Sequence, residues 1–229
     1  SAADILNGSV TLTLTATSAA GCVNATDFMI LTINQQATVN AGVDATICET
    51  GTYTLSTATA SDYTSLLWTT SGTGTFSDAT LLNPVYTPGA GELGSVTLTL
   101  TATSAGPCVD ATDAMVLTIN PQATANAGVD ATICEGSSYT LSTASATNAA
   151  TYTWSTNGTG AFTDATILNA TYNPSAGDIL NGSVTLTLTA TSAAGCVNAT
   201  DFMVLTINQQ ATVNAGADAT ICETGTYTL

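Results

Sequence analysis

The sequence predicts an all-β protein built from tandem β-sandwich domains in series. One observation is that the chain copies itself: Ser1–Leu55 recurs as Ser175–Leu229, with changes only at Ala3/Gly177, Ile30/Val204 and Val43/Ala217. A second is a strict alternation of Thr with apolar residues, which is the period of a half-buried strand. A third is that strand-like runs are separated by clusters of Gly, Pro, Asn, Asp and Ser, as in an all-β sandwich.

The repeats set the expected domain boundaries. The segment Ser-Val-Thr-Leu-Thr-Leu-Thr-Ala-Thr-Ser begins at Ser9 and returns at Ser95 and Ser183, offsets of 86 (95 − 9) and 88 (183 − 95) residues. Near-identical copies at a fixed period are typical of a long array. We therefore expect the C-terminal part of a repeat at 1–36, complete repeats at 37–122 and 123–210, and the N-terminal part of the next repeat at 211–229, all within a longer array.

The first half of the repeat 37–122 contains these predicted strands in order: Ala37–Ile47, Tyr53–Ser56 and Leu66–Thr70. The first of them is interrupted at Ala41-Gly42, where a kink or bulge would switch the chain between sheets. The third is centred on Trp68, which recurs as Trp154 in the next repeat. Both Trp residues are expected to point inward and anchor the sandwich core.

The second half begins with two short strands at Gly72–Phe76 and Asn83–Tyr86. They are expected at a sheet edge, where Pro84 is tolerated. The strongest strand signal follows at Val96–Thr103, whose apolar residues face the core while its Thr residues face water. Ala114–Ile119 returns as the last strand. No 3.6-residue apolar period survives anywhere, so no helix is expected.

Recurrent motifs connect these elements to a known class of repeat. They are Ala41-Gly-Val-Asp44 leading to Thr46-Ile47, the Trp68 strand, Asn83-Pro-Val-Tyr86, and the alternating run from Val96 followed by a Gly turn. This pattern resembles the PKD-like and Ig-like repeats of giant bacterial surface proteins. The Thr-Ile-Cys-Glu and Ala-Gly-Cys variants are similar to repeats of giant Bacteroidota cell-surface adhesins of the SprB type, which serve gliding motility. The resemblance covers the whole chain and implies tandem Ig-like/PKD-like β-sandwich domains.

Composition excludes several classes of partner and activity. Lys, Arg and His are absent, whereas Asp and Glu number 16, which gives a formal net charge of −16. Nucleic acids and anionic membranes bind through protein cations, so neither is an expected partner. The chain is not expected to be an enzyme either, because it has no His or Lys to act as a base and its Ser and Thr residues have no partner base.

The acidic residues offer two candidate sites. Asp110 and Asp113 are the closest carboxylate pair, but Asn24 and Asn198 replace the first carboxylate in the other repeats, which argues against glycoside hydrolysis. Hard oxygen ligands near domain junctions suit calcium, so the candidate metal ligands are Asp44, Asp130 and Asp218. A solvated, capping or turn role is favoured for these aspartates, and no cofactor is expected.

Six cysteines occur in two fixed sequence contexts: after Gly or Pro at Cys22, Cys108 and Cys196, and in Thr-Ile-Cys-Glu at Cys48, Cys134 and Cys222. Two cysteines in each repeat, without His and without a C-x-x-C motif, favour disulfides over zinc. Disulfides in turn indicate an oxidising, extracellular location at the cell surface.

Pairing within one repeat is not expected. Cys48 closes the first strand at one end of the sandwich and Cys108 opens the last strand at the other, roughly 30 Å away for about ten strand residues. A disulfide spans only about 5.5 Å between Cα atoms. The bonds are therefore expected to join neighbouring repeats.

Two arrangements of the repeats give different pairings. If repeats stack end to end, Cys48 pairs with Cys196, and partners outside this chain take Cys22, Cys108, Cys134 and Cys222. If the chain folds back at each linker, the pairs are Cys22–Cys48, Cys108–Cys134 and Cys196–Cys222. We favour the stacked arrangement, because tandem sandwiches usually extend.

The sequence therefore predicts a structural shaft of an extracellular filament or giant cell-surface adhesin, whose repeats give length and stiffness for attachment or gliding. The expected partners are neighbouring repeats of the same long chain and other filament chains. One alternative is a module that binds glycan or ice through Thr97, Thr99 and Thr101. Another is a subunit of a self-assembling fibre or surface layer.

Overall fold

The computed structural model describes residues 1–228 and divides the chain into two compact units. The first unit comprises Ser1–Gln122 together with Ala193–Cys196, and the second comprises Ala123–Ser192 together with the residues from Val197 onward. The division after Gln122 coincides with the expected start of the repeat 123–210. Each unit is described in turn below.

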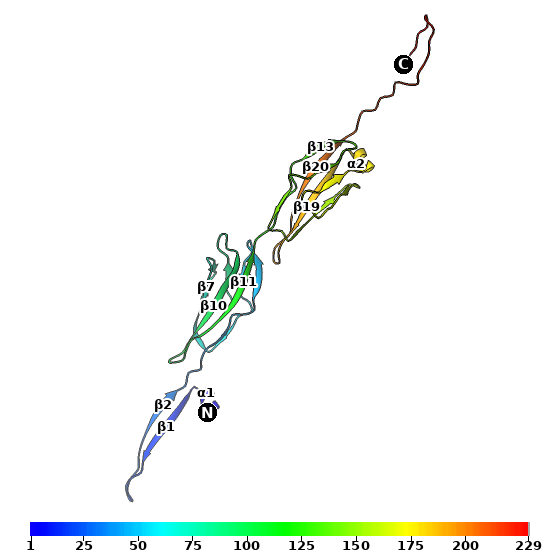
Figure 1. Ribbon diagram of the computed structural model, residues 1–229. Helices are drawn as coiled ribbons and strands as arrows, with labels where there is room; N and C mark the ends of the chain where they lie inside the picture. The colour runs from blue at the N-terminus through cyan, green and yellow to red at the C-terminus, as the bar shows by residue number, and fades with distance from the viewer. Residues whose placement is uncertain (229) are drawn as a thin grey trace. The chain divides into compact units, whose positions relative to one another are not determined.

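The first unit begins with a short helix, α1 (Ala2–Asn7), and a hairpin of β1 (Ser9–Ala16) and β2 (Ala25–Thr32) (Figure 1). The repeat that follows contains β3 (Thr38–Asn40), β4 (Ala45–Cys48), β5 (Tyr53–Thr54), β6 (Thr59–Ser61), β7 (Tyr63–Thr70), β8 (Thr75–Phe76), β9 (Val85–Thr87), β10 (Gly94–Ser104) and β11 (Ala111–Asn120). These strands form the sheets β4-β11-β10-β7, β5-β9-β8 and β3-β6.

The second unit repeats the same order. Its elements are β12 (Thr124–Asn126), β13 (Ala131–Cys134), β14 (Tyr139–Thr140), β15 (Ser145–Thr147), β16 (Thr151–Thr156), β17 (Ala161–Phe162), β18 (Thr171–Asn173), α2 (Ala176–Asn181), β19 (Ser183–Thr191) and β20 (Ala199–Asn208). The sheets are β13-β20-β19-β16, β14-β18-β17 and β12-β15. Among the described residues, those after Asn208 form no strand.

Each complete repeat has its own core, built from the alternating faces of its long strands. In β10, Val96, Leu98 and Leu100 are at most 4% exposed, while Thr97 is exposed and Thr99 is half-buried. Trp68 and Trp154 are each 2% exposed and belong to the cores of their repeats. The period of two in the sequence therefore becomes a division between core and surface.

The break at Ala41-Gly42 transfers the chain from one sheet to another. β3 pairs with β6, whereas β4 pairs in parallel with β11. Gly42 has a φ of 98°, and a Cβ added there would overlap the Thr57 hydroxyl, so only glycine fits this corner. The new pairing places Cys48 opposite Asn120, which sets the position of one cysteine of the candidate site.

The expectation of no helix is wrong, because α1 and α2 are helical. The carboxylate of Asp178 accepts a hydrogen bond from Ser175 N, and the Ser175 hydroxyl accepts one from Asp178 N, which forms a capping box. Gly182, with a φ of 75°, ends α2. Helices of 6 residues are too short to produce a 3.6-residue apolar period. None of the described helices is long and apolar enough to span a membrane.

Candidate functional site: a disulfide-anchored loop

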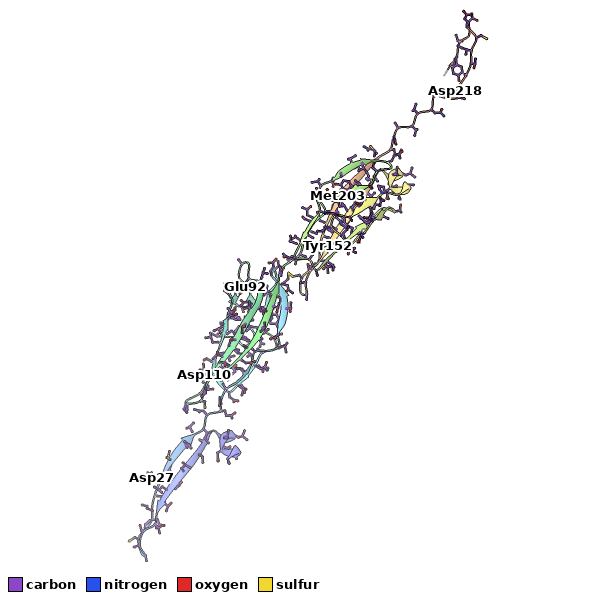
Figure 2. All side chains as sticks on the ribbon, in the orientation of Figure 1. Asp27, Glu92, Asp110, Tyr152, Met203 and Asp218 are labelled. Carbon is purple, nitrogen blue, oxygen red and sulfur yellow. A yellow bond between two sulfur atoms is a disulfide. The ribbon has the colours of Figure 1, made fainter. Side chains whose placement is uncertain are left out.

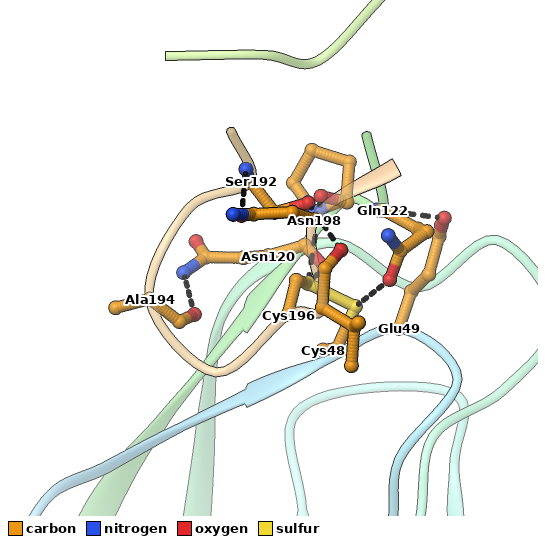
Figure 3. The surroundings of a disulfide bond; sticks show 10 residues. Cys48, Glu49, Asn120, Gln122, Ser192, Ala194, Cys196 and Asn198 are labelled. Carbon is orange, nitrogen blue, oxygen red and sulfur yellow. Dashed lines mark hydrogen bonds between the residues drawn. A yellow bond between two sulfur atoms is a disulfide. The ribbon is translucent and has the colours of Figure 1, made fainter. Parts of the chain in front are cut away.

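A disulfide joins two cysteines that lie far apart in the sequence. The sulfurs of Cys48 and Cys196 are 2.06 Å apart, their Cα atoms are 4.8 Å apart, and 148 positions separate them in the chain (Figure 3). This is the pairing that the stacked arrangement predicts. It uses the sulfurs that the fold-back arrangement would assign to Cys22–Cys48 and Cys196–Cys222, so those two pairs do not form in this structure.

Strand pairing positions Cys48. It ends β4, whose parallel register with β11 sets Cys48 against Asn120. The next residue, Glu49, donates its N–H to Asn120 O over 2.9 Å, and its side chain accepts the N–H of Gln122 over 2.9 Å. The pairing of Ile47 with Ile119 holds the residue before Cys48, and the two contacts of Glu49 hold the residue after it. Backbone geometry therefore fixes the position of Cys48.

The loop between β19 and β20 carries Cys196, and its residues Ala193–Cys196 belong to the first unit. The Asn120 side chain donates to Ala194 O over 2.8 Å (Figure 3), and Cys196 N donates to Ala193 O over 3.1 Å. Gly195 has a φ of 84°, and a Cβ there would lie 3.1 Å from the Ile47 backbone. Glycine thus allows the loop to approach β4 closely enough for the sulfurs to meet.

Polar oxygens surround the bridged sulfurs. Gln122 Oε1 lies 3.1 Å from Cys48 Sγ, and Asn120 O lies 3.5 Å from Cys196 Sγ. Neither contact is a hydrogen bond, because a disulfide sulfur carries no proton. Cys48 is 6% exposed and Cys196 is half-buried, so the surrounding protein covers most of one sulfur and part of the other.

The other cysteines are thiols in this structure. Cys22, Cys134 and Cys222 are exposed, and Cys108 is half-buried. Cys134 ends β13 opposite Asn208, as Cys48 ends β4 opposite Asn120. The repeat therefore places every described Thr-Ile-Cys-Glu cysteine of a complete sandwich at the same strand end.

Two of the three candidate calcium ligands have structural partners. Asp44 Oδ1 accepts the N–H of Val116 over 2.8 Å, and Asp130 Oδ1 accepts the N–H of Val204 over 2.8 Å. Asp218 lies beyond the last strand and is exposed (Figure 2). Among residues 1–228, no group of three or more His, Cys, Asp or Glu side chains is arranged to hold a metal ion. The first two aspartates link their segment to the neighbouring strand.

The closest carboxylate pair is also used by the backbone. Asp110 Oδ1 accepts the N–H of Ser104 over 2.9 Å, and Asp113 Oδ2 accepts the N–H of Ala41 over 2.7 Å. In the second unit, Asn198 Oδ1 takes the place of Asp110 and accepts the N–H of Ser192 over 3.0 Å. Asp and Asn are interchangeable here because the position needs only one acceptor oxygen.

A buried carboxylate cluster escaped the sequence analysis. Asp178 is 1% exposed, and its Oδ2 accepts the Tyr172 hydroxyl over 2.8 Å and the Gly160 N–H over 2.9 Å. Its Oδ1 accepts the Thr159 N–H over 2.9 Å. In the first unit Glu92 accepts the Tyr86 hydroxyl and the N–H groups of Thr73 and Gly89, which correspond to Tyr172, Thr159 and Ser175 of the second unit. The sequence does carry a signal for this cluster. In both repeats a Gly-Thr-Gly segment is followed by a strand that contains Tyr, and an acidic residue follows that Tyr six positions later.

Opposing effects set the charge of this cluster. Burial of Asp178 by itself would raise the pKa of its carboxyl. The hydrogen bonds from the Ser175 and Thr159 N–H groups, the Tyr172 hydroxyl and the Gly160 N–H outweigh burial, so the pKa lies below its usual value. The carboxylate is therefore charged at neutral pH and serves as a common acceptor for the β16–β17 loop, for Tyr172 of β18 and for the residue before α2.

We expect Asp178→Asn to lower the free energy of unfolding of the second repeat by about 2–3 kcal/mol at pH 7, because an amide has only one acceptor oxygen for these donors. Asp178 has a lower pKa in the folded than in the unfolded state. Its stabilisation is therefore complete above a pH of about 4 and is lost as the pH falls through the folded-state pKa. Urea titrations from pH 7 to pH 2 measure both effects, and the variant is expected to lose this part of the acid dependence.

Asp110→Asn is the matched control, because the chain itself places Asn at both equivalent positions. It is expected to change the free energy of unfolding by less than about 0.5 kcal/mol. Equal losses in the two variants would contradict the structural role of the Asp178 cluster.

No protein family and no curated protein matches the sequence. Among solved structures, the chain is similar to the I-band fragment I67–I69 of titin, with 13% identity, a TM-score of 0.50, and coverage of 89% of this chain and 75% of the titin fragment. Immunoglobulin domains 1–4 of Sidekick-1 match with 14% identity, a TM-score of 0.46, and coverage of 85% and 57%. Extracellular domains 3–5 of Drosophila OTK match with 12% identity, a TM-score of 0.47, and coverage of 81% and 66%.

At these identities the comparison concerns the fold alone. The titin match covers most of both chains, and it agrees with the sheets described above. The predicted fold class is confirmed: the protein is an all-β chain of tandem Ig-like β-sandwich repeats.

Proposed function

We propose that this chain is the shaft of an extracellular filament or giant cell-surface adhesin, and that disulfides let its repeats carry load without lengthening. The observation that carries the proposal is the Cys48–Cys196 bond across 148 positions of the chain. The near-identity of Ser1–Leu55 and Ser175–Leu229 supports a role in which repetition itself is the useful property.

The bond changes the path of a pulling force. A tension applied to the two ends passes along the backbone to Cys48, crosses the sulfur bridge, and continues from Cys196. The backbone from Glu49 to Gly195 carries none of it. Both complete repeats lie largely within this shielded segment, so their hydrogen-bonded sheets are protected from forced unfolding as long as the bond is intact.

Chemistry and composition support a structural role over catalysis. The chain has no His, Lys or Arg. The carboxylates of Asp110, Asp113 and Asp178 accept backbone N–H groups, which gives each of them a structural role. The proposed partners are neighbouring repeats of the same long chain and other filament chains, with attachment or gliding at the cell surface as the biological role.

An extracellular location is part of the proposal. A disulfide persists in an oxidising compartment and is reduced in the cytosol. The lack of Lys and Arg removes every cleavage site for trypsin-like proteases, which suits a surface exposed to secreted proteases.

Single-molecule stretching of the oxidised chain tests the proposal. With the bond intact, complete unfolding is expected to release roughly 500 Å less chain than in Cys196→Ser, since 148 positions at about 3.4 Å each stay bypassed. Cys134→Ser removes an exposed thiol outside the bond and is the matched control, expected to behave as the parent chain. Equal extension of the parent chain and Cys196→Ser would overturn the load-bearing proposal.

A further inference from the structure

The hairpin β1–β2 exposes an apolar face that both complete repeats bury. Leu12 and Leu14 are 46% and 77% exposed, and Met29 and Leu31 are 57% and 45% exposed. The equivalent residues of the complete repeats are at most 1% exposed: Leu98, Leu100, Met115, Leu117, Leu186, Leu188, Met203 and Leu205. The strand register is also the same, so the hairpin is one half of a sandwich core whose inner face has no cover among the described residues.

The outer edge of β2 is open in the same way. In the complete repeats a parallel Ala-Thr-Ile-Cys strand pairs along Leu117–Asn120 and along Leu205–Asn208. The hairpin carries the same residues, Leu-Thr-Ile-Asn, at Leu31–Asn34, yet β2 ends at Thr32 and gains no parallel partner among the described residues. The edge therefore offers backbone groups that suit an added parallel strand.

A thiol lies where that added strand would end. Cys108 Sγ is 3.5 Å from Asn34 O, and Cys196 Sγ is 3.5 Å from Asn120 O in the disulfide-bonded site. In the bonded site, the parallel strand brings Cys48 opposite Asn120 and within reach of Cys196. By the same geometry, a Cys opposite Asn34 would reach Cys108.

Side-chain and backbone anchors for the strand are in place as well. In the complete repeat, Asp113 accepts the N–H of Ala41, and the N–H of Val116 donates to Asp44. Asp27 and Ile30 occupy the equivalent positions of β2, and Asp27 is seen on the hairpin in Figure 2. An incoming Ala-Gly-x-Asp-Ala-Thr-Ile-Cys segment thus finds the same acceptor and the same donor.

We propose that the β1–β2 hairpin and Cys108 form a docking site for the first half of a further repeat, a polypeptide of the sequence type Ala123–Pro174, whose Thr-Ile-Cys-Glu cysteine forms a disulfide with Cys108. This inference goes beyond the proposed function, because it names a partner and a bond that hold whether or not the array bears load.

The choice of occupant follows from what covers the same face in the second unit. There, Leu141, Trp154 and Tyr172 come from residues 123–174, are at most 2% exposed, and pack in one core with the leucines of β19 and β20. Residues 211–229 repeat Asp-Ala-Thr-Ile-Cys-Glu at Asp218–Glu223 and contain no Trp. These residues by themselves would pair with the edge and leave the apolar face uncovered.

The covalent step is a thiol–disulfide exchange that balances without an external oxidant when the incoming cysteine is activated. The probe is the peptide Ala123–Pro174 with its cysteine carried as a mixed disulfide with 2-thiopyridine. The Cys108 thiolate attacks the peptide sulfur, the bond between the two proteins forms, the bond to the pyridine sulfur breaks, and 2-thiopyridone leaves.

The test mixes this peptide at micromolar concentration with the full oxidised chain. Docking raises the local concentration of the peptide cysteine to about millimolar, so Cys108 is expected to react about 100-fold faster than Cys22. Peptide mapping should place the bond at Cys108, and hydrogen exchange should show slower amides in β1, β2 and Leu31–Asn34. Cys108→Ser should abolish the fast phase, and Cys22→Ser should leave it intact.

Two charge variants of the hairpin make a matched pair. Leu14→Asp changes the inner face, whose equivalents Leu100 and Leu188 are 0% exposed, and should slow the reaction at Cys108 at least about tenfold. Phe28→Asp changes the outer face, whose equivalent Phe202 is 62% exposed, and should alter the rate by less than about twofold. Both residues are already exposed in the hairpin, so neither change disturbs an existing core.

A fused chain tests the same proposal when the isolated peptide does not fold. The sequence 123–174 placed before Ser1 recreates the natural Pro174-Ser175 connection, and oxidised glutathione then converts the two thiols to a disulfide while releasing two reduced glutathiones. A bond from the added Thr-Ile-Cys-Glu to Cys108 supports the proposal. Unchanged amide exchange in β1–β2 in both formats overturns it, as does a dimer of the unmodified chain linked through Cys108 and Cys222.

Discussion

Replacing Cys196 with Ser is expected to lower the free energy of unfolding by about 5 kcal/mol in the oxidised chain. The reason is chain entropy: a bond across 148 positions restricts the unfolded ensemble far more than the folded one. The bond restricts the chain only when the residues between Cys48 and Cys196 are unfolded. The expected loss therefore applies to the unfolding of both complete repeats together. Cys196 is the better site for the change, because Cys48 is 6% exposed and a hydroxyl there would add a desolvation cost.

Guanidinium titrations with and without reductant measure this effect. Reductant should bring the parent chain to the stability of Cys196→Ser and should not affect the variant. Cys134→Ser, at an exposed thiol, should change stability by less than about 0.5 kcal/mol. If both Ser variants matched the oxidised parent chain, the disulfide would have no thermodynamic role.

Truncating Trp154 to Ala should cost about 3–5 kcal/mol of the stability of the second repeat. The side chain is 2% exposed, its Nε1 donates to Leu168 O over 3.1 Å, and its ring centroid lies 6.0 Å from that of Phe162. The substitution leaves a cavity in the core and removes the donor that Leu168 O uses. Both losses act on the folded state alone.

Circular dichroism follows the variant's unfolding as a whole. Trp68 is then the remaining Trp of the chain, so fluorescence reports on the first complete repeat, which should keep its stability. Val129→Ala is a control on the exposed surface, at 71% exposure, with an expected change below about 0.5 kcal/mol. A Trp154→Ala loss no larger than that of Val129→Ala would argue against Trp154 as a core anchor.

Local patterns were enough to predict the sandwich. The alternation from Val96 to Thr103 predicts β10 and the buried residues Leu98 and Leu100. A strand with one apolar face can point only that face toward the core. The Gly42 break predicts the change of sheet. By contrast, β6 (Thr59–Ser61) is too short and too polar to stand out, and it exists because β3 pairs with it.

The candidate site was predictable only in part. Strand position showed that Cys48 and Cys108 lie at opposite ends of a repeat, which excludes bonding between them, but it left two sets of inter-repeat pairs. Loop contacts distinguish them: Asn120 holds Ala194, and Gly195 lies against Ile47. Such contacts join segments far apart in the sequence, and no local pattern encodes their distance.

The sequence by itself determined the repeat, the fold class, the inward Trp residues and the absence of cationic chemistry, because these depend on composition and on neighbours within a few residues. Only the tertiary structure decided the Cys48–Cys196 bond, the use of Asp44 and Asp130 as strand links, and the cluster around Asp178. The partners are distant in sequence: the two cysteines are 148 positions apart, the contacts of Asp44 and Asp130 span 72 and 74 positions, and Thr159 and Gly160 lie 19 and 18 positions before Asp178. Proximity of that kind is created by folding, since only the packed sheets bring such groups within hydrogen-bonding distance.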